Sequence, residues 1–141
     1  VTFQPLGVIL GIMPWNFPFW QVFRFAIPAL LAGNGALLKH APISTGAAIE
    51  IETLFKDAKF PESIFRTLVI TNEEATNVIT HPHVAGVSFT GSVAAGRIIA
   101  AEAGKALKRT VLELGGSDPY VILADADLNA AAEACVTSRL L

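Results

Sequence analysis

Short apolar runs alternate with segments of helical periodicity along almost the whole chain, and this alternation restricts the possible folds more than any other feature. We predict strands at the apolar runs, which are residues 7–13, 36–39, 65–70, 84–90, 110–114 and 120–123. We predict helices at residues 19–32, 44–57, 73–80, 93–107 and from 127 to the end. This order favours an α/β fold, a parallel sheet with helices on both faces.

Residues typical of helix ends support these boundaries. Asn72, Ser92 and Asp127 each stand where an N-cap is expected. Residues 33–35, Gly-Asn-Gly, are expected to end the first helix, and Pro28 is an irregularity inside it that can kink it.

Polar groups lie at or near the carboxyl ends of four predicted strands. They are Asn16, Lys39, the Gly91-Ser92 turn and Glu113. Ligands of parallel α/β sheets bind beyond those ends, so we expect the four groups to face one common cleft shaped for a dinucleotide. A helix that begins at Ser92 offers free N–H groups to a phosphate, and Gly91 lets a ligand approach the backbone.

Each of these side chains has an alternative structural role. Asn16 is either a helix cap or an amide donor to a developing oxyanion. Glu113 lies inside an apolar strand, where it either binds backbone amides or acts as a desolvated general base. Lys39 is either a solvated lysine at the sheet edge or a group that meets a ribose or a 2′-phosphate.

Composition excludes several classes of function. The net charge of −2 gives no electrostatic basis for binding nucleic acid. The apolar stretches are too short for a membrane-spanning helix, and no signal peptide is visible. The single cysteine fits a reducing, cytoplasmic location. The chain begins at Val1 without methionine and stops within a helix-like pattern, so we expect it to be part of a longer protein.

The remaining reactive side chains are assigned structural roles. We predict no metal site at His81 and His83, because no further ligands follow at a recognisable spacing. We expect His40 to be structural or solvated. Cys135 lies among small apolar residues at helical spacing, without an adjacent base or cation, and we do not expect it to be a nucleophile.

Four segments then match a known family: MPWNFPFW, LLKHAP, VSFTGSVAAGR and VLELGGSDP. In combination they resemble the NAD(P)-dependent aldehyde dehydrogenase superfamily over essentially the whole chain, and LKHAP and LELGGSDP look most like its succinate-semialdehyde dehydrogenase branch. The resemblance implies a Rossmann-like fold of the aldehyde dehydrogenase type. Residues 1–141 would form part of the dinucleotide-binding domain, with the catalytic and oligomerisation domains outside them.

The resemblance also implies roles for individual residues. Asn16 would be the oxyanion-hole amide, and Glu113 would activate water for deacylation. Lys39 would hold the adenosine ribose, and Leu114 and Gly115 would lie near the nicotinamide. The full set implied to bind NAD or NADP is Ile12, Met13, Pro14, Trp15, Lys39, Thr90, Gly91, Ser92, Gly96, Leu114 and Gly115.

Two departures from the family pattern bear on function. Many NAD-preferring members have a glutamate where this chain has Pro42, so NADP is expected to be tolerated. The family's nucleophilic cysteine belongs to a motif expected shortly beyond Leu141, so this segment alone should be inactive. The full-length parent is expected to be a homo-oligomer that oxidises an aldehyde, with succinate semialdehyde as a candidate. The alternatives are a CoA-acylating relative and a non-catalytic nucleotide-binding module.

Overall fold

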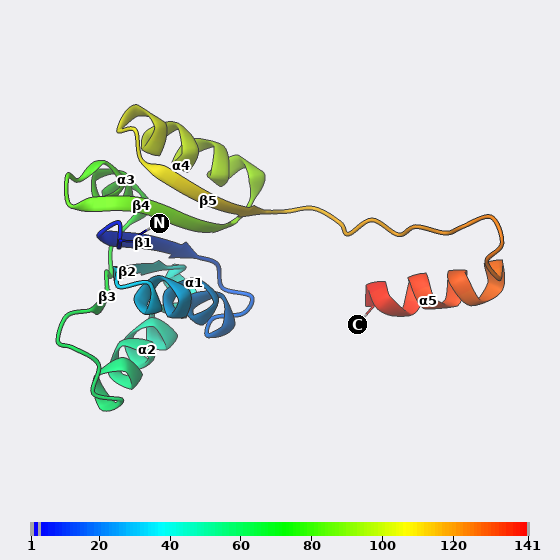
Figure 1. Cartoon of the computed structure of the whole chain (residues 1–141), viewed down its shortest axis with the longest axis horizontal. Helices are drawn as coiled ribbons and strands as arrows, with labels where there is room; N and C mark the ends of the chain where they lie inside the picture. Colours follow the sequence, from blue (N-terminus) through cyan, green and yellow to red (C-terminus); the bar gives the residue numbers. More distant parts are fainter. Residues whose placement is uncertain (1, 3, 141) are drawn as a thin grey trace.

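A five-stranded, entirely parallel sheet organises the chain in a computed structural model that describes residue 2 and residues 4–140 (Figure 1). The strands are β1 (Val8–Met13), β2 (Gly35–His40), β3 (Phe65–Thr67), β4 (Val84–Gly91) and β5 (Arg109–Leu114). Their spatial order is β3-β2-β1-β4-β5, and every neighbouring pair is parallel. The predicted α/β fold is confirmed, and the strand order reverses direction between β1 and β4.

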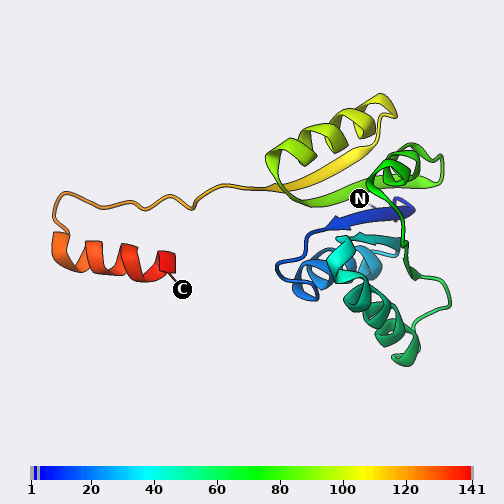
Figure 2. The ribbon, with the colours of Figure 1, turned by 180° about the vertical axis from the view of Figure 1, so that it is seen from behind.

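Helices cover both faces of the sheet, as Figure 1 shows and as the view from behind in Figure 2 agrees. One face carries α1 (Trp20–Leu31) and α2 (Thr45–Asp57), which the short helix η1 (Pro42–Ser44) precedes. The other face carries α3 (Asn72–Thr80) and α4 (Val93–Lys105). The last helix, α5 (Leu128–Leu140), follows an extended segment and lies away from the sheet in both views.

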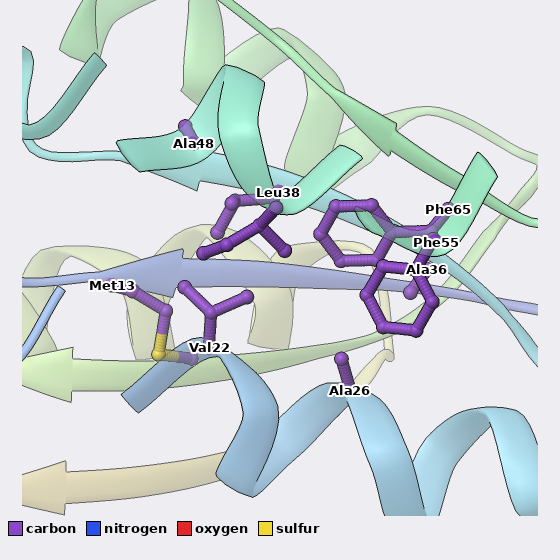
Figure 3. Close-up of a cluster of buried hydrophobic side chains, with 9 residues drawn as sticks. Met13, Val22, Ala26, Ala36, Leu38, Ala48, Phe55 and Phe65 are labelled. Carbon is purple, nitrogen blue, oxygen red and sulfur yellow. The ribbon is translucent and has the colours of Figure 1, made fainter. Parts of the chain in front are cut away.

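The sheet separates two apolar cores. On the α1 and α2 face, Phe55 stacks on Phe65 with ring centroids 4.6 Å apart, and Leu38 and Val22 are fully buried beside them (Figure 3). The core on the opposite face is formed by Leu10, Ile79, Val84, Val87 and Ala103. Burial on both faces explains why these strands read as continuous apolar runs rather than as alternating ones.

Two predicted helix caps are confirmed by their hydrogen bonds. The Ser92 hydroxyl accepts from the backbone N–H of Ala95 at 3.2 Å at the start of α4. The Asp127 carboxylate accepts from the N–H groups of Asn129 and Ala130 at 2.9 and 3.1 Å at the start of α5. Both ends satisfy backbone donors that a helix otherwise leaves free.

The predicted cap at Asn72 is wrong, because α3 begins one residue earlier. Thr71 is the N-cap, and with Glu74 it forms a capping box: the Thr71 hydroxyl accepts from the Glu74 N–H, and the Glu74 carboxylate accepts from the Thr71 N–H. This exchange leaves the Asn72 side chain free for a contact with β2, described below.

The predicted strand at residues 120–123 is also wrong. The segment between β5 and α5 is extended but pairs with no strand of the described sheet. Its side chains, from Tyr120 to Leu123, are all exposed. An apolar run becomes a strand only where a neighbouring strand takes up its backbone hydrogen bonds, and no such neighbour lies beside these residues. In addition, β3 ends at Thr67, three residues earlier than predicted.

Candidate functional site

The predicted site residues form a row along the carboxyl edge of the sheet. In the strand register, Ile12 of β1 lies between Lys39 of β2 and Phe89 of β4. One residue further along β4, Thr90 is paired with Glu113 of β5, and Gly91 with Leu114. Asn16 follows the end of β1. The sequence therefore placed these groups correctly at one edge of the sheet.

The expectation of one common cleft is wrong for the side chains of Lys39 and Glu113, which lie on opposite faces of the sheet. Lys39 lines a cavity against α3 and α4, together with Phe89. Glu113 lines a second cavity against α1, together with Thr90. The physical reason is the alternation of side chains along a strand: Phe89 and Thr90 are adjacent in sequence, so they point to opposite faces.

The cavity on the α3 and α4 face, called the α3/α4 cleft below, has a volume of about 180 Å³ and mostly apolar walls. Ile12, Phe89 and Ile98 contribute to these walls, and Lys39 is the cation among them. The Lys39 side chain is only 3% exposed, and its Nζ donates to Asn72 Oδ1 at 2.5 Å. The alternative of a solvated lysine is therefore wrong, and the same burial lowers the pKa of Lys39.

The turn into α4 lies beside this cleft and is shaped by close packing. A Cβ at Gly91 would lie 2.5 Å from the Phe89 ring, and a Cβ at Gly96 would lie 2.5 Å from Leu114 Cδ2. Gly96 thereby lets α4 approach β5 closely. With Ser92 capping Ala95, the first N–H groups of α4 face the carboxyl edge of the sheet.

The cavity on the α1 face, called the α1 cavity below, has a volume of about 260 Å³ and contains an ion pair. Arg24 Nη2 of α1 donates to Glu113 Oε1 of β5 at 2.9 Å. Both side chains are about half exposed, 48% for Arg24 and 47% for Glu113. Glu113 is therefore paired with Arg24 and hydrated in this chain, so the alternative of a desolvated carboxylate is wrong.

Arg24 is the site residue that sequence reasoning missed. In the sequence it only interrupts an apolar segment between Phe23 and Phe25. That interruption is a usable signal, because a cation placed in the apolar stretch of a helix needs a partner or a water-facing position. Its partner lies 89 residues away in sequence, so spacing could not identify it.

The loop between β1 and α1 carries Asn16 among exposed aromatic residues. Asn16 is exposed, and Trp15 is 66% exposed. The neighbouring Pro14 is partly buried, whereas Met13 is buried in the core with Val22 and Leu38. Met13 can therefore meet a ligand at the edge only through its backbone. Gly115, at the other end of the site, is exposed just after β5.

The other candidate residues lie outside this edge. Cys135 is a free, partly buried cysteine on α5. Among the residues that the structure describes, no three His, Cys, Asp or Glu side chains are grouped so as to hold a metal ion. Over the same residues, no helix combines the length and the hydropathy that crossing a bilayer requires.

Comparison with known proteins gives concordant results. The family model described as "Aldehyde dehydrogenase family" matches residues 1–141. The succinate semialdehyde dehydrogenase [NAD(P)+] Sad of Escherichia coli is 52% identical over 139 residues, which are 99% of this chain and 30% of that protein. A probable succinate-semialdehyde dehydrogenase [NADP(+)] of Synechocystis is 50% identical over 140 residues, or 99% of this chain and 31% of that protein.

A solved structure extends this likeness to three dimensions. The succinic semialdehyde dehydrogenase of Streptococcus pyogenes, in complex with NADP+, superposes with a TM-score of 0.84 at 42% identity, covering 92% of this chain and 29% of that one. The chain thus spans about 30% of the length of the curated relatives that it matches. Since the family model covers all of residues 1–141, and the fold agrees with that of a solved relative, this chain belongs to the aldehyde dehydrogenase family.

Proposed function

We propose that residues 1–141 are part of the dinucleotide-binding domain of an enzyme that oxidises an aldehyde to a carboxylic acid with NAD or NADP. The observation that carries this proposal is the row of Asn16, Lys39, Gly91-Ser92 and Glu113 at the carboxyl edge, in a chain that the family model matches throughout. Catalytic and oligomerisation domains would lie in the rest of the protein, and the relatives are about three times as long.

The α3/α4 cleft has the chemistry that the adenosine half of the cofactor requires. Its walls are apolar, as an adenine ring needs, and Lys39 supplies a donor for ribose hydroxyls. The start of α4 lies next along the edge and offers N–H groups to the pyrophosphate. When bound, the nicotinamide would accept two electrons from the substrate.

On the α1 side of the sheet, two groups of this chain are proposed to act on the substrate. The Asn16 amide would donate to the oxygen that becomes negatively charged when a thiolate from elsewhere in the enzyme attacks the aldehyde. Glu113 would take a proton from the water that releases the acid. Glu113 is accessible enough for this role, since its side chain is 47% exposed.

We further propose that the aldehyde carries a carboxylate at its far end, as succinate semialdehyde does. Arg24 supports this choice, because a guanidinium beside the proposed base is a fork that fits a carboxylate. Two of the relatives are named for succinate semialdehyde. A substrate carboxylate would compete with Glu113 for Arg24 and so release the base.

Steady-state assays of the full-length enzyme that contains these residues test this function. Succinate semialdehyde should be oxidised faster than butanal at low concentration. R24Q should raise KM for succinate semialdehyde about fivefold, because an ion pair that water reaches is worth about 1 kcal/mol. KM for butanal should stay within about twofold of the wild-type value, because butanal has no carboxylate for Arg24 to bind. Absence of oxidation of either aldehyde, with both cofactors present, would refute the proposed function. An equal effect of R24Q on the KM of both aldehydes would refute the proposal that Arg24 binds a carboxylate of the substrate.

The same proposal includes the assembly and location of the enzyme. Large exposed apolar side chains on β5 and on residues 120–123 support assembly into a homo-oligomer. The single free cysteine is consistent with a reducing, cytoplasmic location. Sedimentation of the full-length protein gives its oligomeric state, and a purely monomeric enzyme would contradict the first of these points.

A further inference from the structure

His40, at the end of β2, is a buried imidazole that the proposed chemistry does not use. Its side chain is 6% exposed, and both ring nitrogens have backbone partners. Nε2 lies 2.9 Å from the carbonyl oxygen of Pro18. Nδ1 lies 2.9 Å from the backbone nitrogen of Ala41 and 3.2 Å from the carbonyl oxygen of Met13. The backbone N–H of Ala41 can only donate, and it is the shorter of the two contacts of Nδ1, so Nδ1 is its acceptor and carries no proton. The ring proton then stands on Nε2, which donates to the carbonyl oxygen of Pro18.

These contacts hold both ends of the loop that carries Asn16. At the first end, the N–H of Ala41 also donates to the carbonyl oxygen of Met13 at 3.0 Å. At the second end, the His40 ring donates to Pro18, two residues after Asn16. The four residues in between, 14–17, are therefore fixed to β2 at both sides. Within that loop the exposed side chains of Trp15 and Phe17 supply little packing of their own.

We propose that His40 is a positioning residue, which keeps the amide of Asn16 where the negative charge develops. This inference rests on the proposed function. An oxyanion donor contributes only when it is held in place before the reaction, because the energy of reorienting it would otherwise be lost from transition-state stabilisation. Loss of the hydrogen bond to Pro18 should therefore lower kcat while leaving the α3/α4 cleft, on the other face of the sheet, intact.

Two substitutions test whether the hydrogen bond to Pro18 matters, or whether any polar side chain at position 40 is sufficient. H40Q places an amide NH₂ near the position of Nε2, so it keeps the donor to Pro18. H40N places its amide near the position of Nδ1, so it keeps the partner of Ala41 and loses the donor to Pro18. Both replace the ring by a neutral amide of similar chemistry, which makes each a control for the other.

Turnover of the full-length enzyme is the first measurement. We expect H40N to reduce kcat about tenfold or more and H40Q to keep kcat within about threefold of wild type. In the N16A background, H40N should add little further loss, because the two residues act through one amide. Wild-type turnover in H40N, equal losses in H40N and H40Q, or full additivity with N16A would each overturn the proposal.

Backbone hydrogen exchange is the second measurement, and it does not depend on activity. Peptides covering residues 14–19 should exchange faster in H40N than in wild type and H40Q, while peptides from α4 should not change. Unchanged exchange at residues 14–19 in H40N would show that His40 does not hold the loop, and the proposal would be overturned. Failure of the wild-type enzyme to oxidise any aldehyde refutes the proposed function, and the exchange data then still decide whether His40 fixes the loop.

Discussion

Two charged groups at the same edge of the sheet differ in how much water reaches them. Lys39 in the α3/α4 cleft is 3% exposed and bound to Asn72, whereas Glu113 in the α1 cavity is 47% exposed and bound to Arg24. The register pairs Lys39 with Ile12, which is also paired with Phe89, and it pairs Glu113 with Thr90. Because Phe89 and Thr90 are consecutive residues of β4, the two charged groups lie on opposite faces of the sheet.

The difference shows how one sheet edge provides both a rigid group and an adaptable one. A buried ammonium has no water to replace a lost partner, so Lys39 is held in one position. An exposed ion pair is worth only about 1 kcal/mol or less, so Glu113 can leave Arg24 at small cost. A fixed contact suits recognition of a cofactor, and a replaceable one suits a base that must meet water and substrate.

The substitution E113Q should produce the largest effect and tests the α1 side of this comparison. A general base contributes about 10²- to 10⁴-fold to turnover, so kcat of the full-length enzyme should fall by a factor in that range. KM for the cofactor should change little, because the adenosine half is assigned to the other face. Initial rates at saturating aldehyde provide the measurement.

The exposed Glu50 on α2 offers a matched control for this experiment. E50Q makes the same chemical change away from the carboxyl edge and should leave kcat unchanged. If E113Q keeps more than about half of wild-type turnover, water is activated by another group, and the division of roles between the faces is wrong.

The substitution P42E should produce a smaller effect and tests the cofactor side. Pro42 begins η1, two residues after the last residue of β2. The resemblance to the family implies that a glutamate at this position binds the ribose hydroxyls. Repulsion between that carboxylate and a 2′-phosphate should lower the kcat/KM ratio of NADP over NAD about tenfold. P42Q, which lacks the charge, should leave the ratio near that of wild type. A wild-type enzyme that already rejects NADP would contradict the expectation drawn from Pro42.

The pH dependence of stability should produce the smallest effect and tests the burial of Lys39. Burial lowers the pKa of Lys39 below its ordinary value of 10.5, so the folded protein releases this proton at a lower pH than the unfolded chain does. The Lys39 contribution to the free energy of unfolding should therefore rise as pH increases from the lowered pKa towards 10.5. Denaturant titrations of wild type and K39M at a series of pH values below 10.5 isolate this contribution. If the free energies of unfolding of wild type and K39M change with pH in parallel, Lys39 is solvated.

The sequence was sufficient for the order of the strands and α-helices from β1 to β5, although not for residues 120–123, and for the edge at which the polar groups gather. Apolar runs bounded by Gly, Pro and capping residues mark each strand of the sheet, and Ser92 and Asp127 cap the helices that they were predicted to cap. These are local properties, which depend on residues within one helical turn or one strand.

The contacts that divide the site could not be read from the sequence, because they depend on register and on long-range pairs. The face to which Glu113 points follows from its pairing with Thr90, and a shift by one residue would reverse it. The pair of Lys39 with Asn72 depends on Thr71, rather than Asn72, capping α3. The bond between His40 and Pro18 joins residues 22 positions apart, with no local pattern to reveal it.

Strand β5 forms an exposed edge of the described sheet. Along β5, Val111 is 60% exposed, and Leu112 and Leu114 are 36% and 41% exposed, on a strand whose only described neighbour is β4. Its outer row of N–H and C=O groups is a template on which another strand can add. Residues 1–141 produced by themselves should therefore aggregate through this strand. A charged residue in place of Val111 would be the first remedy to try in making the segment tractable for crystals or NMR.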